Sequence, residues 1–426
     1  MRAFAWARKL LRSERGNVLA IGAAAMPLMI GAAAVGLDTI QFSLWKRQLQ
    51  RMADSNALAG AHALVQAKSV SSAVTRDLLL NNQLTLLTGY PIVENAPTTG
   101  DWAGNTKAVR VVLSAKRDLP FWRFFQGESP TVTVEATAAV VNSGRFCLLT
   151  LEEGPVQAIN FTGNATVNLG CGIATNSTAV PAIDAGGSSS LIADPIMARG
   201  GLDATNPYYG NSTIIPYSDK QEDPFASRPD PSAAANGMGC DDDFDDLASV
   251  TLNETGPNGV ANTAVCFNSM TIDRTINLPA GTYYIKNGNL NLGSHAAVTG
   301  TNVTLIFTGT GDSIGKIEMN GQASLTLSAP ETGVYRDIVI FRDKDRATMD
   351  DWHLNGGNSL NLTGALYMPK TNILINGNST MTSSCLQIVS QRISFSGNLN
   401  LANGLTANCS NKPGETFTLS QVRLVG

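Results

Sequence analysis

The sequence predicts a mainly β protein in three parts: an N-terminal transmembrane helix, a small α+β unit, and a C-terminal domain resembling a parallel β-helix, a type of solenoid. Three observations lead to this prediction. Asn17 to Leu37 form an uncharged stretch of 21 residues. From Phe146 onward, a short motif returns about every 20 residues. Only 15% of the residues are charged and 40 are glycine, which is typical of turn-rich β structure and not of a disordered chain.

The uncharged stretch is long enough to cross a membrane. At 1.5 Å per residue it spans roughly 30 Å, the hydrocarbon thickness of a bilayer. Five Lys or Arg residues and one Glu precede it, so the positive-inside rule places residues 1–16 in the cytoplasm. We therefore expect a single-pass protein of the inner (plasma) membrane, with the bulk of the chain periplasmic or extracellular. A cleaved signal peptide stays open as an alternative, because small-residue triplets such as 23–25 follow the basic segment.

The helix that follows the apolar stretch carries a face of small and medium-sized side chains. No Gly or Pro interrupts the chain from Asp38 until Gly60, so residues 1–68 are expected to form a basic cytoplasmic tip, the transmembrane helix and its external continuation. Two neighbouring stripes at helical spacing make up the face. Its residues are Gln48, Leu49, Met52, Ala53, Asp54, Asn56 and Ala57. This face suits either partner helices of an assembly or the protein's own next domain, and the sequence leaves both interpretations open.

Residues 69–145 are expected to form the small α+β domain. Apolar residues alternate with other residues at 108–115 and 131–141, which predicts two strands. An aromatic segment lies between the two strands. We interpret its Trp122, Phe124 and Phe125 as core residues; contact with the nearby membrane surface is the alternative.

Residues 146–426 are expected to form the β-helix-like domain, with an irregular, Pro-rich insertion at about 201–264. The recurring motif places a glycine two residues after an apolar position and an apolar–polar–apolar run four residues after that glycine, as in 161–169 and 319–327. A period near 20 residues with short alternating strands is a solenoid signature, because one coil cannot bury its own apolar face and must stack on neighbours.

Six cysteines fall within this domain: Cys147, Cys171, Cys240, Cys266, Cys385 and Cys409. Neighbours along the chain are separated by 24, 26 and 24 positions in three pairs, and none forms a CxxC. This pattern favours disulfides over zinc ligands, with buried free thiols as the alternative. Of the 15 possible connectivities we favour the three sequential pairs, since one coil separates their sulfurs and adjacent rungs lie roughly 4.8 Å apart. We expect these links to stiffen the first and last coils, where a solenoid has uncovered edges.

A calcium site is a weak candidate at Asp241, Asp243 and Asp245. These residues match positions 1, 3 and 5 of a calcium loop, but Asp246 replaces the glycine and Leu252 the glutamate that such a loop needs. A solvated acidic loop is therefore the default interpretation. No other metal site and no cofactor is expected.

The acidic residues of the segment 343–351 are the candidate for catalysis. Many β-helices cleave polysaccharides with paired carboxylates, but here Arg and Lys interleave with Asp, as in simple surface ion pairs. We expect no catalytic residues and no enzyme activity. The net charge of −4 also argues against nucleic acid as a partner.

The N-terminal region resembles the membrane anchor of the TadG-like proteins of Tad/Flp pilus assembly. The resemblance is carried by Arg15-Gly16-Asn17-Val18 at the start of the apolar span, by Gly36-Leu37-Asp38 at its end, and by the helix 49–59 with its Ala- and Asp-rich pattern. The runs 278–285 and 364–369 are similar to the C-terminal regions of that family. The chain also resembles type IV pilin precursors, but Ile21 stands where those carry a glutamate, which argues against a processed pilin.

This resemblance implies a membrane-anchored, outward-facing accessory or structural component of Tad/Flp pilus assembly. It implies pilus-assembly or pseudopilin proteins as partners, bound through the N-terminal helix. The alternative is a membrane-anchored β-helix protein that binds or cleaves cell-envelope polysaccharide. Fold alone does not decide between them.

Overall fold

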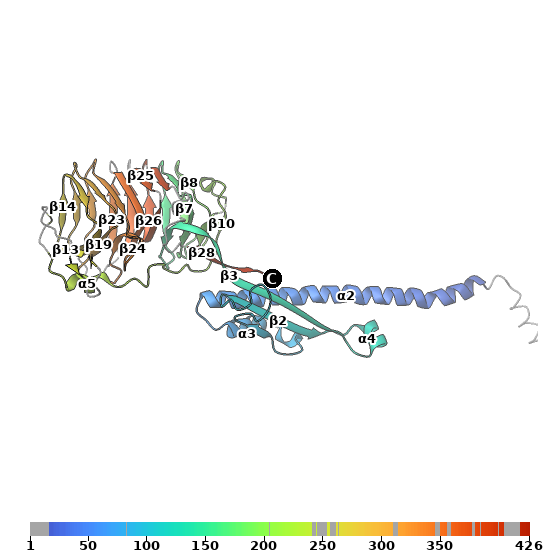
Figure 1. Ribbon diagram of the computed structural model, residues 1–426. Helices are drawn as coiled ribbons and strands as arrows, with labels where there is room; N and C mark the ends of the chain where they lie inside the picture. The colour runs from blue at the N-terminus through green and yellow to red at the C-terminus, as the bar shows by residue number, and fades with distance from the viewer. Residues whose placement is uncertain are drawn as a thin grey trace, which may run out of the picture. The chain divides into compact units, whose positions relative to one another are not determined.

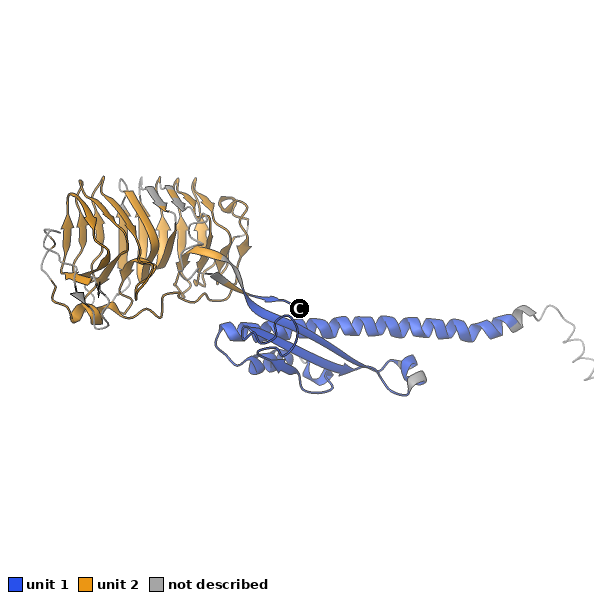
Figure 2. Cartoon of the chain, viewed as in Figure 1, with its two compact units in different colours: residues 1–141, 422–426 blue, residues 142–421 orange. Residues whose placement is uncertain are grey.

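The computed structural model describes residues 17–81, 83–203, 205–240, 244, 254–255, 261–262, 264–309, 314–345, 350–355, 359–376, 380–383, 385–398, 400–403 and 418–426. The chain forms two compact units, the first from residues 1–141 and 422–426 and the second from residues 142–421 (Figure 2). It is mainly β, with 40% strand and 21% helix, and it contains an N-terminal apolar helix and a parallel β-solenoid of about nine turns over residues 146–395. The predicted fold class is therefore confirmed.

The first unit is built around one long helix. Its elements are α2 (Asn17–Val65), α3 (Val70–Leu80), η2 (Leu84–Leu86), β1 (Ile92–Glu94), β2 (Ala108–Lys116), α4 (Pro120–Gln126) and the first part of β3 (Thr131–Thr150). The three strands form an antiparallel sheet, and α4 lies at the tip of the β2–β3 hairpin beside α2 (Figure 1). Helix α2 runs through Pro27 without ending, as membrane helices tolerate.

The core of this unit joins the second half of α2 to the sheet. Leu49, Ala53 and Ala57 recur at four-residue spacing on α2 and are fully buried. They belong to one hydrophobic cluster with Val111 of β2 and Leu78 of α3. Because alternate residues of β2 point to opposite faces of the sheet, the buried ones form a continuous apolar surface for the helix.

The chain's C-terminal end closes the first unit. Strand β28 (Thr418–Leu424) leads to two reciprocal backbone bonds: Thr137 N–H donates to Gly426 C=O at 2.7 Å, and Val425 N–H donates to Thr137 C=O at 2.9 Å. The chain therefore leaves this unit along β3 and re-enters it within β28. The whole solenoid is, in connectivity, an insertion into the first unit.

The solenoid consists of two arms of coils. The first arm contains the end of β3, β4 (Ile159–Phe161), β5 (Thr166–Asn168), β6 (Gly172–Thr175), β7 (Ile183–Ala185), β8 (Ser190–Ile192), β9 (Ile196–Ala198), η3 (Pro207–Tyr209) and β10 (Ile214–Ile215). The second arm begins with β13 (Ala264–Phe267), β14 (Met270–Ile272), β15 (Thr275–Leu278), β16 (Gly281–Lys286), β17 (Leu290–Leu292), β18 (Ala297–Gly300), β19 (Val303–Thr308), β20 (Ile317–Met319) and β21 (Ser324–Ser328). It ends with β22 (Ile338–Arg342), β23 (Asp350–Asn355), β24 (Ser359–Asn376), β25 (Thr380–Ser383), β26 (Leu386–Phe395) and β27 (Asn400–Asn403).

The coils do not stack in the order of the sequence. On one face the parallel strand order is β13, β16, β19, β22, β24, β26, β3, β6, β9, β10. The chain thus enters in the middle of the stack at β3, winds outward to β10, returns to the far end at β13, and winds back until β26 pairs with β3. Figure 1 shows the resulting colour order, yellow to red and then green.

The segment expected as an irregular insertion has two roles in this arrangement. Its first part, with η3 and β10, covers one end of the stack, where the Tyr209 hydroxyl donates to Ile183 C=O at 2.9 Å. The following residues connect the two ends of the stack and contain α5 (Pro231–Asn236), β11 (Glu254–Thr255) and β12 (Ala261–Asn262). On the way, Phe225 packs on the Tyr367 ring at 5.1 Å. At the other end, the buried Phe244 packs edge-on against Phe267 at 5.1 Å.

Three glycines occupy one stacked turn in the coils on either side of the β3 coil's junctions. Gly163, Gly187 and Gly397 all have positive φ, between 76° and 82°. A Cβ on Gly163 would lie 2.9 Å from Gly397 N, and a Cβ on Gly187 would lie 2.7 Å from Gly163 O. Backbone conformation and close approach both demand glycine at these positions. In the motif copy 319–327 the positive φ falls on Gln322, and a Cβ on Gly321 would meet nothing within 4 Å.

Candidate membrane site at the outer end of the apolar helix

Helix α2 has an exposed apolar surface over its first half. It is the one helix in the described part of the chain that is long and apolar enough to cross a membrane. Large apolar side chains are exposed along the uncharged stretch and past its end, and these are Ile21, Met26, Leu28, Met29, Ile30, Val35, Leu37, Ile40 and Leu44. A soluble protein rarely leaves so much contiguous apolar surface uncovered, so this half of α2 fits a membrane anchor.

Asp38, at the end of the uncharged stretch, holds α4 against α2. Its carboxylate oxygen Oδ2 accepts a hydrogen bond from the backbone N–H of Trp122, 2.5 Å away. This N–H lies in the first turn of α4, where no intrahelical acceptor exists, and the N-cap residue Leu119 has no side chain that could serve. A carboxylate is also favoured at a helix N-terminus by the helix dipole. Asp38 of the Gly36-Leu37-Asp38 run therefore has a structural role.

An apolar cavity of about 500 Å³ lies between α2 and the α4 hairpin. Its lining residues are Val35, Asp38, Thr39, Phe42, Leu119, Phe121, Trp122, Pro130 and Thr131. Among the described residues that line it, Asp38 is the only ionisable one. The Oδ1 atom of Asp38 is buried and has no hydrogen-bond partner among the described residues.

The aromatic side chains of α4 are exposed. Trp122 is 47% exposed and Phe124 is 83% exposed, so the interpretation of these residues as core is wrong; the side chain of Phe125 is outside the described set. The reason is the length of α4, which has only seven residues and turns just one side toward α2. The aromatic content of the segment suggested a core, whereas its position at a hairpin tip leaves most of its surface uncovered.

The predicted assembly face of α2 is largely used within the first unit. Leu49, Met52, Ala53, Asn56 and Ala57 are buried. Gln48 is exposed and Asp54 is half-buried, where its Oδ1 accepts a hydrogen bond from the Gln50 amide at 2.9 Å. The contacts thus fit the interpretation in which this face packs on the protein's own domain. The exposed positions of this stretch are Lys46, Arg47, Gln48, Arg51 and Ser55.

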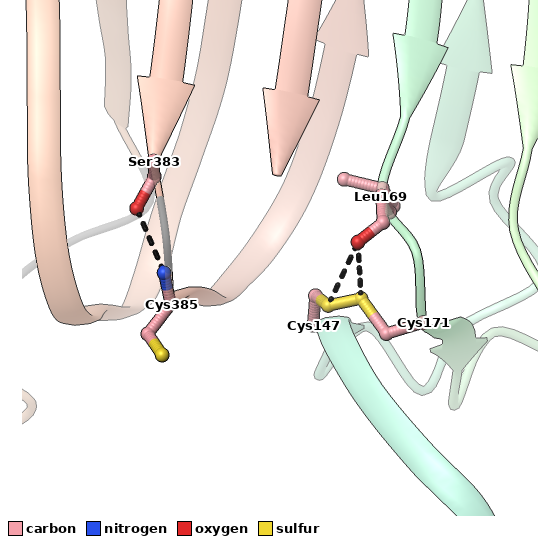
Figure 3. The surroundings of a disulfide bond; sticks show 5 residues. All are labelled: Cys147, Leu169, Cys171, Ser383 and Cys385. Carbon is pink, nitrogen blue, oxygen red and sulfur yellow. Dashed lines mark hydrogen bonds between the residues drawn. A yellow bond between two sulfur atoms is a disulfide. The ribbon is translucent and has the colours of Figure 1, made fainter. Parts of the chain in front are cut away.

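Two of the three favoured disulfide pairs are present. Cys147 is joined to Cys171 with their Cα atoms 5.8 Å apart (Figure 3). Cys240 is joined to Cys266 with their Cα atoms 4.5 Å apart. Cys385 is also disulfide-bonded, and Cys409 lies outside the described residues. The second bond lies at the β13 end of the stack, as expected. The first does not protect an end, because the coil of β3 lies between those of β26 and β6.

The acidic candidates in the solenoid have structural partners. The buried Arg342 forms a two-pronged ion pair with Asp350, one arm of which joins Nη2 to Oδ2 at 2.7 Å. Asp351 accepts a hydrogen bond from the Asn372 amide at 2.9 Å. The buried Asp343 accepts one from the Thr308 hydroxyl at 2.7 Å, and burial raises the pKa of its carboxyl. The calcium candidates Asp241, Asp243 and Asp245 lie outside the described residues.

Asp230 and Asp345 lie close to Asp343, and the three carboxylates have oxygen atoms within 4.8 Å of one another. Asp230 accepts hydrogen bonds from the backbone N–H and hydroxyl of Ser232 at the start of α5. Asp343 accepts a bond from the Asp345 N–H at 2.9 Å. These contacts stabilise local turns, and the turns account for the closeness of the three carboxylates.

No family model, curated protein or solved structure matches the chain. The TadG-like resemblance of the N-terminal region therefore stays a prediction.

Proposed function

We propose that this protein is a single-pass membrane component that carries its β-solenoid outside the cytoplasm, as a non-enzymatic accessory part of Tad/Flp pilus assembly. The observation that carries the proposal is the continuity of α2. One helix leads from an exposed apolar surface at Ile30 to a buried stripe at Leu49 and Ala53. The anchor and the core of the first unit share this helix. A force or a displacement applied to the anchor is therefore passed along α2 to the folded unit.

The orientation rests on charge. The basic N-terminal flank would stay in the cytoplasm, which leaves both compact units on the outer side. Disulfides fit that side, since they form and persist in oxidising compartments. The assignment to pilus assembly is supported by the resemblance of residues 15–59 to the anchor of the TadG-like proteins, and by the runs 278–285 and 364–369, which are similar to their C-terminal regions.

The polysaccharide alternative has less support. Sugar binding commonly uses aromatic rings exposed along a coil face, and among the described Phe, Tyr and Trp residues of the second unit only Tyr217 is exposed. Three of the four carboxylates considered as candidates for cleavage, those of Asp343, Asp350 and Asp351, are engaged by Thr308, Arg342 and Asn372. The described surface therefore favours a structural role.

The test is site-specific photo-crosslinking in intact cells that carry Tad/Flp genes. A photoreactive residue at the exposed Arg51 or Ser55 should capture pilus-assembly or pseudopilin proteins, and one at the exposed Thr99 serves as the matched control. Protection of an N-terminal tag from protease added to spheroplasts checks the orientation. Capture of nothing at 51 and 55, together with retention on a glycan array, would overturn the proposal in favour of the polysaccharide alternative.

A further inference from the structure

We infer that α4 is a second membrane contact: it lies in the headgroup layer of the bilayer that α2 spans, and a phospholipid of that bilayer occupies the cavity between α2 and α4. The inference rests on the proposed anchoring by α2. It assigns a ligand class, a two-chain phospholipid, to residues that the pilus-assembly proposal does not use.

The first argument is the depth of α4 along α2. The exposed apolar surface of α2 ends at Leu44, and the first basic residue beyond the span is Lys46. From Asn17 to Leu44 the helix rises about 42 Å, which equals the thickness of a bilayer with its headgroup layers. The cavity touches α2 between Val35 and Phe42. With the hydrocarbon ending near Leu37, this stretch falls at the headgroup layer.

The second argument is the chemistry of the hairpin tip. Trp and other aromatic residues are enriched at membrane interfaces, and basic side chains next to them attract lipid phosphates. Here Trp122 and Phe124 are exposed on a short helix, and Arg123 between them has an exposed side chain. Lys116 and Arg117 at the end of β2 are exposed as well.

The third argument identifies the occupant of the cavity. The wall formed by Val35 and Phe42 is continuous with the lipid-facing surface of α2, so the molecules that cover that surface also reach the cavity. The lining is apolar apart from Thr39, Thr131 and Asp38, and an acyl chain suits it. The buried Oδ1 atom of Asp38 is left to accept a hydrogen bond from a headgroup N–H or O–H.

The experiment measures the depth of three spin labels on the full chain in vesicles of phosphatidylethanolamine and phosphatidylglycerol. Labels are attached to Phe124→Cys in α4, Ile30→Cys in the span and Thr99→Cys in the β1–β2 loop, all at exposed positions whose substitution leaves the core intact. Power saturation compares access by oxygen, which concentrates in lipid, with access by a water-soluble nickel complex. We expect the oxygen-to-nickel ratio to be highest for the label at 30 and lowest for the control label at 99. The ratio for the label at 124 should be several-fold above that of the control.

The outcomes separate the two proposals. A water-like ratio at 124 with a lipid-like ratio at 30 would overturn the inference and leave the anchor in place. A water-like ratio at 30 would overturn the anchor itself. Dipolar broadening between labels at 124, with a low oxygen ratio, would show that a second copy covers α4 and would also overturn the inference.

Discussion

The coil that begins with β3 has two neighbours, and it is joined to them by different means. On one side the coil of β6 follows it directly in the chain, and Cys147–Cys171 bridges them across 24 residues. On the other side it meets the coil of β26, and the contact between Glu152 and Arg392 spans 240 residues. We call this second junction the seam and define it as the contacts of residues 146–168 with residues 386–403.

The seam matches an ordinary coil junction in its backbone pairing. Parallel register continues from Ile388 to Leu148 on one face and from Leu401 to Val167 on another. Inside, the Phe161 and Phe395 rings stack with centroids 4.9 Å apart and nearly parallel planes. The apolar core is therefore continuous through the seam.

The difference lies in the cost of bringing the partners together. Closing a loop costs free energy in proportion to the logarithm of its length, so a tenfold longer loop costs about 2 kcal/mol more. No cysteine pair with described partners crosses the seam, so side-chain contacts must offset that cost. Glu152 supplies several of these contacts. Its Oε2 accepts hydrogen bonds across the seam from Arg392 at 2.7 Å and from Gln391 at 3.1 Å. Its Oε1 accepts a hydrogen bond from the Gly154 N–H at 2.7 Å. The seam should therefore open before other junctions.

The largest effect should come from removing a stacked ring at the seam. Phe161→Ala deletes a fully buried ring and should lower the free energy of unfolding by about 3–5 kcal/mol. Phe307→Ala is the matched control, a buried ring of β19 far from the seam in the stack order. Hydrogen exchange on the detergent-solubilised chain should show faster exchange at 146–168 and 386–403 in Phe161→Ala only. If hydrogen exchange at 146–168 and 386–403 became faster to the same extent in both variants, the seam would not be the weakest junction.

Removal of the neighbouring disulfide should have a somewhat smaller effect. Replacing Cys147 and Cys171 with serine frees a loop of 24 residues and should cost about 3 kcal/mol in the chain-entropy description. Denaturant unfolding measures this cost. Because the coils of β3 and β6 follow one another directly in the chain, their junction should still form, and hydrogen exchange at β6 should rise no more than exchange at the seam. Preferential opening of the β3–β6 junction would show that it depends on the covalent link.

The coil architecture was predictable from sequence, whereas the stacking order was not. Each coil repeats the same local signals, a turn glycine such as Gly163 and an alternating run such as 166–168, so the period is visible along the chain. Any coil of this pattern presents the same edge to a neighbour, so local pattern does not specify which coil stacks on which. The pairings of β26 with β3 and β4 and of β27 with β5 distinguish this arrangement from a sequential one. For the same reason the position of Cys147 within the stack was mispredicted.

The candidate membrane site is only half predictable from the sequence. The uncharged span is a direct signal, and Asp38 at its end belongs to the Gly36-Leu37-Asp38 run that carries the resemblance. That Asp38 caps α4 depends on a contact across 84 residues, which no periodicity reveals. Trp122 and Phe124 were assigned to the core because aromatic residues usually lie there, and the hairpin tip that exposes them is a tertiary feature.

A smaller effect should follow from weakening the ionic contact of the seam. Glu152 is 6% exposed whereas its neighbour Glu153 is exposed and pairs with Lys220 at the surface. Glu152→Gln should cost about 1–2 kcal/mol, because a partly buried charge pair loses its attraction while the shape is kept. Glu153→Gln should cost less than about 1 kcal/mol. A double-mutant cycle with Arg392→Ala isolates the pair, and a coupling energy near zero would contradict the role of Glu152 at the seam.

The smallest effect should appear as a pH dependence. Burial alone would raise the pKa of Glu152, but the Gly154 N–H and the Arg392 and Gln391 side chains outweigh it and lower the pKa below its ordinary value. A carboxyl with a lowered folded-state pKa contributes stability above its unfolded-state pKa of about 4.3 and loses it as the pH falls through the folded-state value. Stability should therefore decline more steeply below about pH 4.3 in the native chain than in Glu152→Gln. Comparing the two proteins cancels other carboxyls such as Asp343, whose raised pKa acts in the opposite direction. Identical acid profiles would mean that Glu152 titrates alike in the folded and unfolded chain, and the seam would then depend on its apolar contacts.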